Sequence, residues 1–110
     1  MASLSDHVAD NGVAMARRLV IKVGSALIVD AKTRKPNQYW LATLAADIAE
    51  LRAAGKQVVL VSSGAAALGR PFLTDAEKSG KQGQLELKQA AAAIGQPRLM
   101  ASLQAAFDLQ

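Results

Sequence analysis

The sequence predicts an α/β fold with parallel strands, and three neighbouring segments carry this prediction. Two short apolar runs rich in β-branched residues, 19–23 and 57–61, are typical of strands buried in a sheet. Between them, residues 38–54 repeat apolar side chains at the period of an amphipathic helix. A strand, a helix and a second strand of this length favour parallel pairing through a right-handed crossover.

The first strand and the helix after it have clear boundaries. Strand 19–23 ends at Gly24, and a polar stretch containing Gly, Ser and Pro runs on to Pro36. Asn37 is placed to cap the helix, and Gly55 is placed to end it. Five apolar side chains at helical spacing predict the buried face of this helix: Leu41, Leu44, Ala45, Ile48 and Leu51.

Small residues follow strand 57–61 and predict a tight turn and a short helix. The turn is the Ser-Ser-Gly segment 62–64, and the helix is expected over 65–70. Pro71 ends this helix, because proline has no N–H to continue the hydrogen-bond ladder.

The rest of the chain predicts helices and no third strand. Residues 72–83 are polar and predict a mobile surface loop. Two helices then follow, 85–94 and 97–109, with Gly95 as the break between them. A parallel sheet of two strands would keep exposed edges and poorly covered faces, so the fold is expected to be incomplete.

The composition is that of an ordinary globular domain. The 110 residues are 51% hydrophobic and 20% charged, which predicts a packed core in a single domain. We assign residues 16–110 to that domain and residues 1–15 to a flexible N-terminal extension without a signal-peptide pattern. The sequence has neither a cysteine nor an apolar run long enough to span a bilayer, which favours a cytoplasmic protein without a membrane partner.

The chain carries a formal net charge of +4, a balance that suits nucleic acid or another anionic ligand. Most basic side chains are scattered and are not interleaved with aromatic residues, so nucleic acid is not the expected partner. Two local groups stand out, namely Arg17 with Arg18 before the first strand, and Lys32, Arg34 and Lys35 in one loop.

The carboxyl ends of the two strands are the expected place for chemistry, because ligands gather there in open α/β sheets. The first end offers a cation, a glycine that lets backbone approach a ligand, and a hydroxyl. The second end offers a hydroxyl and small-residue amides at the start of a helix. The residues concerned are Lys22, Gly24 and Ser25 in the first group and Ser63, Gly64 and Ala65 in the second.

Such a pair of strand ends suits phosphoryl transfer. The charge on a transferring phosphoryl group must be neutralised by fixed cations and donors while the acceptor is held in line. Lys22 suits the first task, and the Ser63 hydroxyl with the amides after it could hold an acceptor carboxylate. On local pattern alone, a strand-end lysine that extends into water and an ordinary capped turn are the more common explanations of the same residues.

Other classes of site lack the residues that they need. Gly64 and Gly69 have the spacing of a P-loop, but Arg70 and Pro71 stand where lysine and serine or threonine are required. No dinucleotide-binding glycine pattern follows either strand. Since His7 is the only histidine, the sequence offers neither a Ser-His-Asp triad nor a histidine metal site, and no metal ligands are predicted.

Three ordered blocks resemble the N-terminal region of the glutamate 5-kinases, a branch of the amino-acid-kinase family. They read R-L-V-I-K-V-G-S from residue 18, V-V-L-V-S-S-G-A-A-A-L-G-R from residue 58 and K-Q-A-A-A-A-I-G-Q from residue 88. The K-x-G start is shared by the wider family, whereas the later blocks are typical of the glutamate 5-kinase branch. The fold implied is a partial αβα sandwich, truncated after the first two strands and the helices that follow.

The resemblance implies that the γ-phosphate of ATP is transferred to the side-chain carboxylate of L-glutamate with Mg²⁺, the first step of proline biosynthesis. By motif, the ATP-binding residues would be Lys22, Gly24 and Ser25, with Lys22 catalytic, and the glutamate-binding residues would be Ser63, Gly64 and Ala65.

At other positions the resemblance implies less definite roles. Lys88 and Gln89 would shape the pocket or a subunit contact. Ala26 departs from the K-x-G-S/T-S pattern of the family, so no hydroxyl role is carried over to it. A homo-oligomer is expected of the full-length protein. The remaining substrate-binding residues and the nucleotide-binding half would lie beyond residue 110, so we expect this chain to be inactive alone.

Two alternatives stay open from the sequence. The chain could be a non-catalytic anion-binding or assembly module of the same fold, or part of an amino-acid kinase with a different acceptor.

Overall fold

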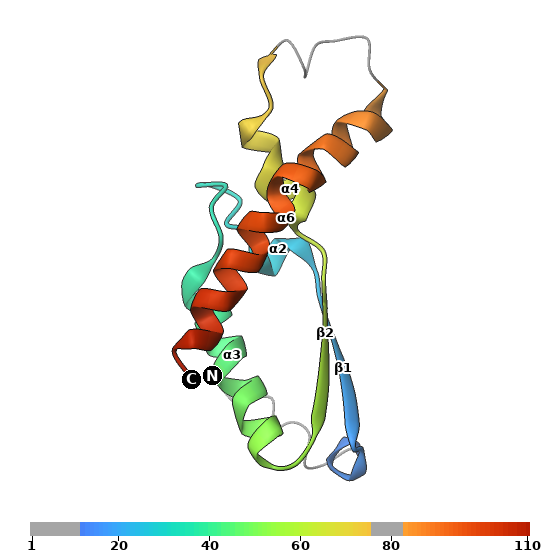
Figure 1. Ribbon diagram of the computed structural model, residues 1–110, viewed down its shortest axis with the longest axis vertical. Helices are drawn as coiled ribbons and strands as arrows, with labels where there is room; N and C mark the ends of the chain where they lie inside the picture. Colours follow the sequence, from blue (N-terminus) through green and yellow to red (C-terminus); the bar gives the residue numbers. More distant parts are fainter. Residues whose placement is uncertain (1–11, 76–82) are drawn as a thin grey trace.

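The computed structural model describes residues 12–75 and 83–110 (Figure 1). In chain order the elements are η1 (Val13–Met15), β1 (Arg18–Val23), α2 (Ser25–Ile28), α3 (Gln38–Ala53), β2 (Gln57–Ser62), α4 (Ala65–Gly69), η2 (Arg70–Phe72) and α6 (Gln84–Asp108). The predicted α/β fold class is confirmed, because both predicted strands and the helix between them form close to the expected boundaries.

Strands β1 and β2 pair in parallel, in the register that sets Lys22 opposite Val61. Successive side chains alternate between the two faces of the sheet. The face that carries Ile21 and Leu60 packs against the hydrophobic core, whereas Val20 on the other face is 66% exposed. In Figure 1, α3 and α6 lie on the same side of the two-stranded ribbon. The sheet therefore has a covered face, toward these helices, and an open face.

Helix α3 buries the apolar stripe that its spacing predicts, and all five predicted core positions on it are buried. Asn37 occupies the position before the first turn, but its side chain makes no cap bond there. Its amide Nδ2 donates instead to the Leu27 carbonyl at 3.5 Å, so the predicted capping role is wrong. Gly55 follows the helix with a φ of 86°, a conformation in which glycine avoids the clash of a Cβ.

The stretch between β1 and α3 is more structured than the sequence indicates. A short helix, α2, forms at its start, where the sequence predicts a polar loop. Ile28 and Val29 are buried, and Val29 forms an isolated antiparallel bridge with Pro36. Because these apolar residues enter the core, only residues 30–35 form a surface loop.

A single helix, α6, replaces the two helices predicted after residue 84, so the predicted break at Gly95 is wrong. Gly95 is buried at the point where α6 crosses α4, and Pro97 lies inside the helix with its ring exposed. Packing on one side of α6 outweighs the local preference of glycine and proline for helix ends. The buried residues that hold both halves of the helix are Ala91, Gly95, Leu99 and Ala106.

The hydrophobic core joins the covered face of the sheet to α2, α3, α4 and α6. Its largest fully buried side chains are Ile28, Leu41 and Leu99. The predicted loop 72–83 falls partly outside the described residues, at 76–82, while Leu73 at its start is buried. None of the charged side chains in the described ranges is fully buried.

The predicted extension 1–15 lies mostly outside the described residues. Its described end forms η1, and the Lys56 ammonium donates to the carbonyl oxygens of Ala14 and Ala16 at 2.6 Å each. The boundary of the domain at residue 16 stays a prediction. Within residues 12–75 and 83–110, no helix is long and apolar enough to cross a membrane.

Candidate functional site at the strand ends

The parallel ladder brings the ends of β1 and β2 to the same edge of the sheet. Val23 lies opposite Ser62, and the backbone N–H of Ser63 donates to the Val23 carbonyl at 3.2 Å, so the register continues past the last strand pair. The turn into α2 and the turn into α4 therefore start side by side. A crevice shared by these two turns stays a prediction.

Lys22 lies on the open face of the sheet. Its neighbours along β1, Ile21 and Val23, both turn toward the core, and Lys22 itself is exposed. Ser62 faces the core side in β2, and Ser63 after it is exposed. By strand alternation Lys22 and Ser63 belong to the same face, two residues apart along the ladder, with no core packed between them.

Gly24 leaves open space beside Lys22. A Cβ at this position would meet no atom within 4 Å, so a ligand could approach the backbone closely. Ser25 begins α2 with an exposed side chain. The arrangement therefore provides a cation, free space and a hydroxyl together at the end of β1.

Gly64 and Ala65 have packing roles of their own. Gly64 is buried above Ile28, and a Cβ would come within 3.2 Å of the Ile28 Cγ2 atom. The Ala65 carbonyl oxygen lies against Gly95 of α6, where a Cβ would come within 1.6 Å of it. Close packing alone therefore accounts for the small residues of this segment, and it fixes the start of α4 relative to the core.

The other residues singled out by the resemblance lie on α6. Lys88 and Gln89 are both exposed in the first half of the helix. Neither lines the two cavities described below, and their contribution to a pocket or a subunit contact stays a prediction.

The strand ends fit the phosphates of a nucleotide better than they fit a metal ion. Lys22, Gly24 and Ser25 supply a positive charge, space and a hydroxyl, which are the groups that a phosphate needs. No group of three or more His, Cys, Asp or Glu side chains capable of holding a metal occurs within residues 12–75 and 83–110. Mg²⁺ is therefore assigned to no side chain of these ranges.

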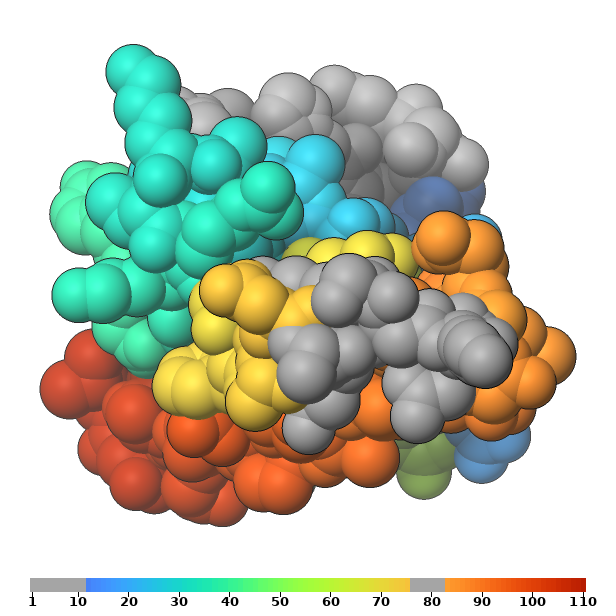
Figure 2. Space-filling view, turned by 90° about the horizontal axis from the view of Figure 1, so that it is seen from above, coloured from blue at the N-terminus to red at the C-terminus, as the bar shows by residue number. Residues whose placement is uncertain are grey.

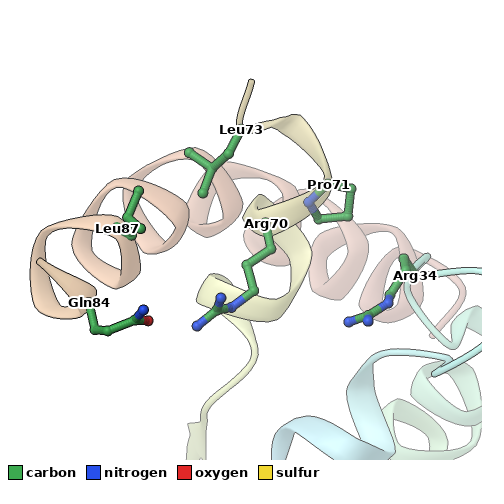
Figure 3. A pocket seen from close by; sticks show the side chains of 6 residues that line it. All are labelled: Arg34, Arg70, Pro71, Leu73, Gln84 and Leu87. Carbon is green, nitrogen blue, oxygen red and sulfur yellow. The ribbon is translucent and has the colours of Figure 1, made fainter. Parts of the chain in front are cut away.

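The structure also gathers basic residues that the sequence left unassigned. A cavity of about 490 Å³ is lined by Arg34, Arg70, Pro71, Leu73, Gln84 and Leu87 (Figure 3). A second cavity of about 330 Å³ shares Arg34 and is lined also by Lys35, Pro36, Leu68, Phe72, Arg98, Ala101 and Ser102. The basic loop around Arg34 was the only sequence signal for this region, because residues 70 and 98 lie far from it in the chain.

Comparison with known proteins identifies the class to which this fold and these strand ends belong. The sequence pattern of the amino acid kinase family matches residues 17–110, and the chain belongs to that family.

Among individual relatives, the chain is similar to glutamate 5-kinases. It is 56% identical over 93 residues to the glutamate 5-kinase of Caulobacter vibrioides (strain NA1000 / CB15N), which covers 84% of this chain and 24% of that protein. It is 54% identical over 84 residues to that of Ruegeria sp. (strain TM1040), covering 76% and 22%. With glutamate 5-kinase 2 of Mesorhizobium japonicum the identity is 47% over 85 residues, covering 77% and 29%. The chain thus spans about a quarter of the length of these relatives, and the predicted resemblance is confirmed.

Proposed function

We propose that this chain supplies the phosphate-binding and acceptor-binding part of a glutamate 5-kinase. Such an enzyme transfers the γ-phosphate of ATP to the side-chain carboxylate of L-glutamate. One observation carries the proposal. Lys22 and Ser63 lie at the ends of two adjacent parallel strands, at the same edge of the sheet and on the same face of it. The similarity to glutamate 5-kinases across most of this chain supports the choice of acceptor.

Each strand end has its own task in this proposal. The Lys22 ammonium balances negative charge on the transferring phosphoryl group, and Gly24 and Ser25 hold the phosphates of ATP beside it. A carboxylate oxygen of glutamate attacks the γ-phosphorus, and the bond from that phosphorus to the bridging oxygen breaks to release ADP. Mg²⁺, when bound with the nucleotide, would neutralise further phosphate charge.

The acceptor is held at the end of β2. The Ser63 hydroxyl donates to the glutamate, while the Ser63 N–H is already bonded to Val23. The backbone amides at Ala65 and after it belong to the first turn of α4 and have no acceptor within that helix. The backbone of Gly64, which directly precedes these amides, contacts the same substrate in this proposal.

The same proposal places the protein in the cytoplasm as an enzyme of proline biosynthesis, in a homo-oligomer when it is full length. A kinase that uses another acceptor is the nearest alternative. It is distinguished by comparing L-glutamate with L-aspartate as phosphate acceptors.

A chimera tests the proposed roles. The matching segment of the Caulobacter vibrioides enzyme is replaced by this chain, and glutamate-dependent release of ADP is measured. We expect activity, and we expect Lys22→Ala to lower kcat by about a hundredfold or more, the effect typical of removing one group that stabilises a transition state. Ser63→Ala should mainly raise the KM for glutamate, because it removes a contact made in the ground state as well.

Arg17→Ala is the matched control, since it removes one exposed positive charge outside the strand ends. Its kcat should stay within about twofold of the parent. An unchanged kcat for Lys22→Ala would contradict the catalytic role, and ordinary turnover by the isolated 110-residue chain would contradict the expectation that this chain is inactive alone.

A further inference from the structure

Basic side chains from three separate elements line the two cavities. Arg34 comes from the 30–35 loop, Arg70 from η2 and Arg98 from α6. Figure 2 shows the 30–35 loop, η2 and α6 exposed together at one end of the molecule. In Figure 3 the polar ends of Arg70 and Gln84 face each other, and Arg34 extends toward them from the opposite side.

The charges of these residues are not compensated by the described part of the chain. Among the described lining residues of both cavities there is no Asp or Glu. Within residues 12–75 and 83–110, the guanidinium groups of Arg34 and Arg70 have neither an ion-pair partner nor a hydrogen-bond acceptor. Guanidinium groups bind carboxylates and phosphates through paired N–H donors, so the chemistry of these two side chains suits an oxyanion.

Arg98 is held in position by its surroundings. Its guanidinium carbon lies 3.8 Å from the centre of the Phe72 ring, and its Nη1 donates to the Ile94 carbonyl at 3.4 Å. A cation stacked on an aromatic ring keeps its charge while losing side-chain freedom. The second cavity therefore has a fixed positive charge on its wall.

The 30–35 loop presents Arg34 in a defined backbone conformation. Arg34 has a φ of 60°, which is uncommon for a residue with a Cβ and tends to occur at functional sites. The Arg34 N–H donates to the Asp30 carbonyl at 2.8 Å, and the Asp30 N–H donates to the Lys35 carbonyl at 2.9 Å. A loop ordered in advance loses less conformational entropy on binding than a disordered one.

From these observations we propose that the two adjoining cavities form a site for a small molecule with at least two oxyanion groups, such as a diphosphate or a dicarboxylate. Arg70 and Gln84 bind one oxyanion, Arg98 and Lys35 bind the other, and Arg34 lies between them and lines both cavities. Volumes of about 490 and 330 Å³ lie in the range of small-molecule sites. Leu73 and Leu87 supply an apolar wall.

The residues of this site differ from those of the proposed kinase site. No lining residue of either cavity is among the six residues predicted at the strand ends. Glu86 lies in the first turn of α6 beside Gln84, where it offsets the positive end of the helix. The affinity for an anion is therefore attributed to the arginines and not to the helix terminus.

Calorimetric titration of the 110-residue chain tests the proposal, with pyrophosphate and succinate as separate probes and acetate as the single-oxyanion comparison. Ionic strength is held constant with potassium chloride, because charge interactions weaken with salt. We expect one molecule of pyrophosphate or succinate to bind per chain, with acetate at least tenfold weaker. The stronger of the two probes identifies the phosphate or the carboxylate as the preferred group.

Variants then locate the binding. Arg34→Gln and Arg70→Gln should each weaken binding of the preferred probe by about tenfold or more, since each removes a charged hydrogen-bond donor. Arg17→Gln removes the same charge elsewhere and should leave the Kd within about twofold. Circular dichroism checks that every variant remains folded.

The outcomes separate this proposal from the kinase assignment. Equal weakening by Arg17→Gln and Arg70→Gln would mean binding to net charge alone and would overturn the proposal. Weakening by Lys22→Ala without weakening by Arg34→Gln would place the anion at the strand ends and overturn it as well. An inactive chimera with intact binding at Arg34 and Arg70 would contradict only the kinase function.

Discussion

The Asp30 carboxylate organises the 30–35 loop through the backbone of its neighbours. One of its oxygens accepts the N–H of Lys32 at 2.8 Å and the N–H of Thr33 at 2.9 Å. These bonds, with that to Thr33 the larger influence and that to Lys32 the next, lower the pKa of Asp30 below its ordinary value of 3.8. The charged form of Asp30 is thus the form that the folded loop prefers.

The sign of the resulting pH dependence follows from this lowered pKa. Because the folded pKa is the lower one, the contribution of Asp30 to stability is fully present above the unfolded value and is lost as the pH falls through the folded value. We expect the amide NMR signals of Lys32 and Thr33 to stay constant from neutral pH down to about 4 and to move below it. Asp30→Asn should remove this movement. An Asp30 carboxyl that titrates at or above 3.8 in the folded chain would contradict the prediction.

At the scale of elements, the contact of α4 with α6 depends on two glycines that face each other's backbone. A Cβ on Gly69 would lie 1.7 Å from the Ala91 carbonyl oxygen, and a Cβ on Gly95 would lie 1.6 Å from that of Ala65. Distances this short involve main-chain atoms that cannot rotate away. The two helices can approach this closely only while both positions lack a side chain.

We predict that Gly95→Ala lowers the free energy of unfolding by about 3 kcal/mol, at the upper end of the range for overpacked sites. Alanine in a helix would otherwise be favourable by about 1 kcal/mol, so a loss of stability isolates the packing clash. Gly24→Ala is the matched control, because a Cβ there meets nothing within 4 Å. Urea unfolding measures both variants. Equal stability of Gly95→Ala and the parent would mean that α4 and α6 are not in close contact in solution.

How well the elements can be predicted depends on where their stabilisation comes from. Helix α3 has its apolar stripe in one continuous period, so its sequence contains the information that forms it. In α6, local signals at Gly95 and Pro97 predict a break, but contacts with α4 and the core, distant in sequence, keep the helix continuous. The short α2 is stabilised by burial of Ile28, which a polar local composition hides.

Some contacts of the candidate sites could be predicted from local sequence patterns, whereas others depend on packing between distant segments. Lys22 and Ser63 could be predicted to meet, because strand order and parallel pairing follow from local patterns. The convergence of Arg34, Arg70 and Arg98 could not, because it depends on how the 30–35 loop, η2 and α6 pack in three dimensions. The close packing of Gly64 and Ala65 likewise needed the positions of Ile28 and α6.

At the scale of the whole molecule, the helices that contact the sheet leave its open face uncovered. Val20 is 66% exposed, and Val59 and Val61 are each 45% exposed. Three β-branched side chains in solvent on one face form an apolar surface of the kind that usually contacts other protein. Since this chain spans about a quarter of its glutamate 5-kinase relatives, we predict that this face is buried in a chimera that contains the rest of such an enzyme.

Substitution of Val59 by glutamate distinguishes an open face that is exposed to solvent from one that is covered by the rest of the enzyme. In the isolated chain, Val59→Glu should lower the free energy of unfolding by at most about 1 kcal/mol, the span of strand propensities, because the new charge remains in water. In the chimera with the Caulobacter vibrioides enzyme, the same substitution would bury an unpaired carboxylate and should abolish folding and activity, while Val59→Thr retains both. Thermal unfolding and ADP release measure the two outcomes. An active, stable Val59→Glu chimera would mean that the face stays in solvent, and the valines would then need another explanation.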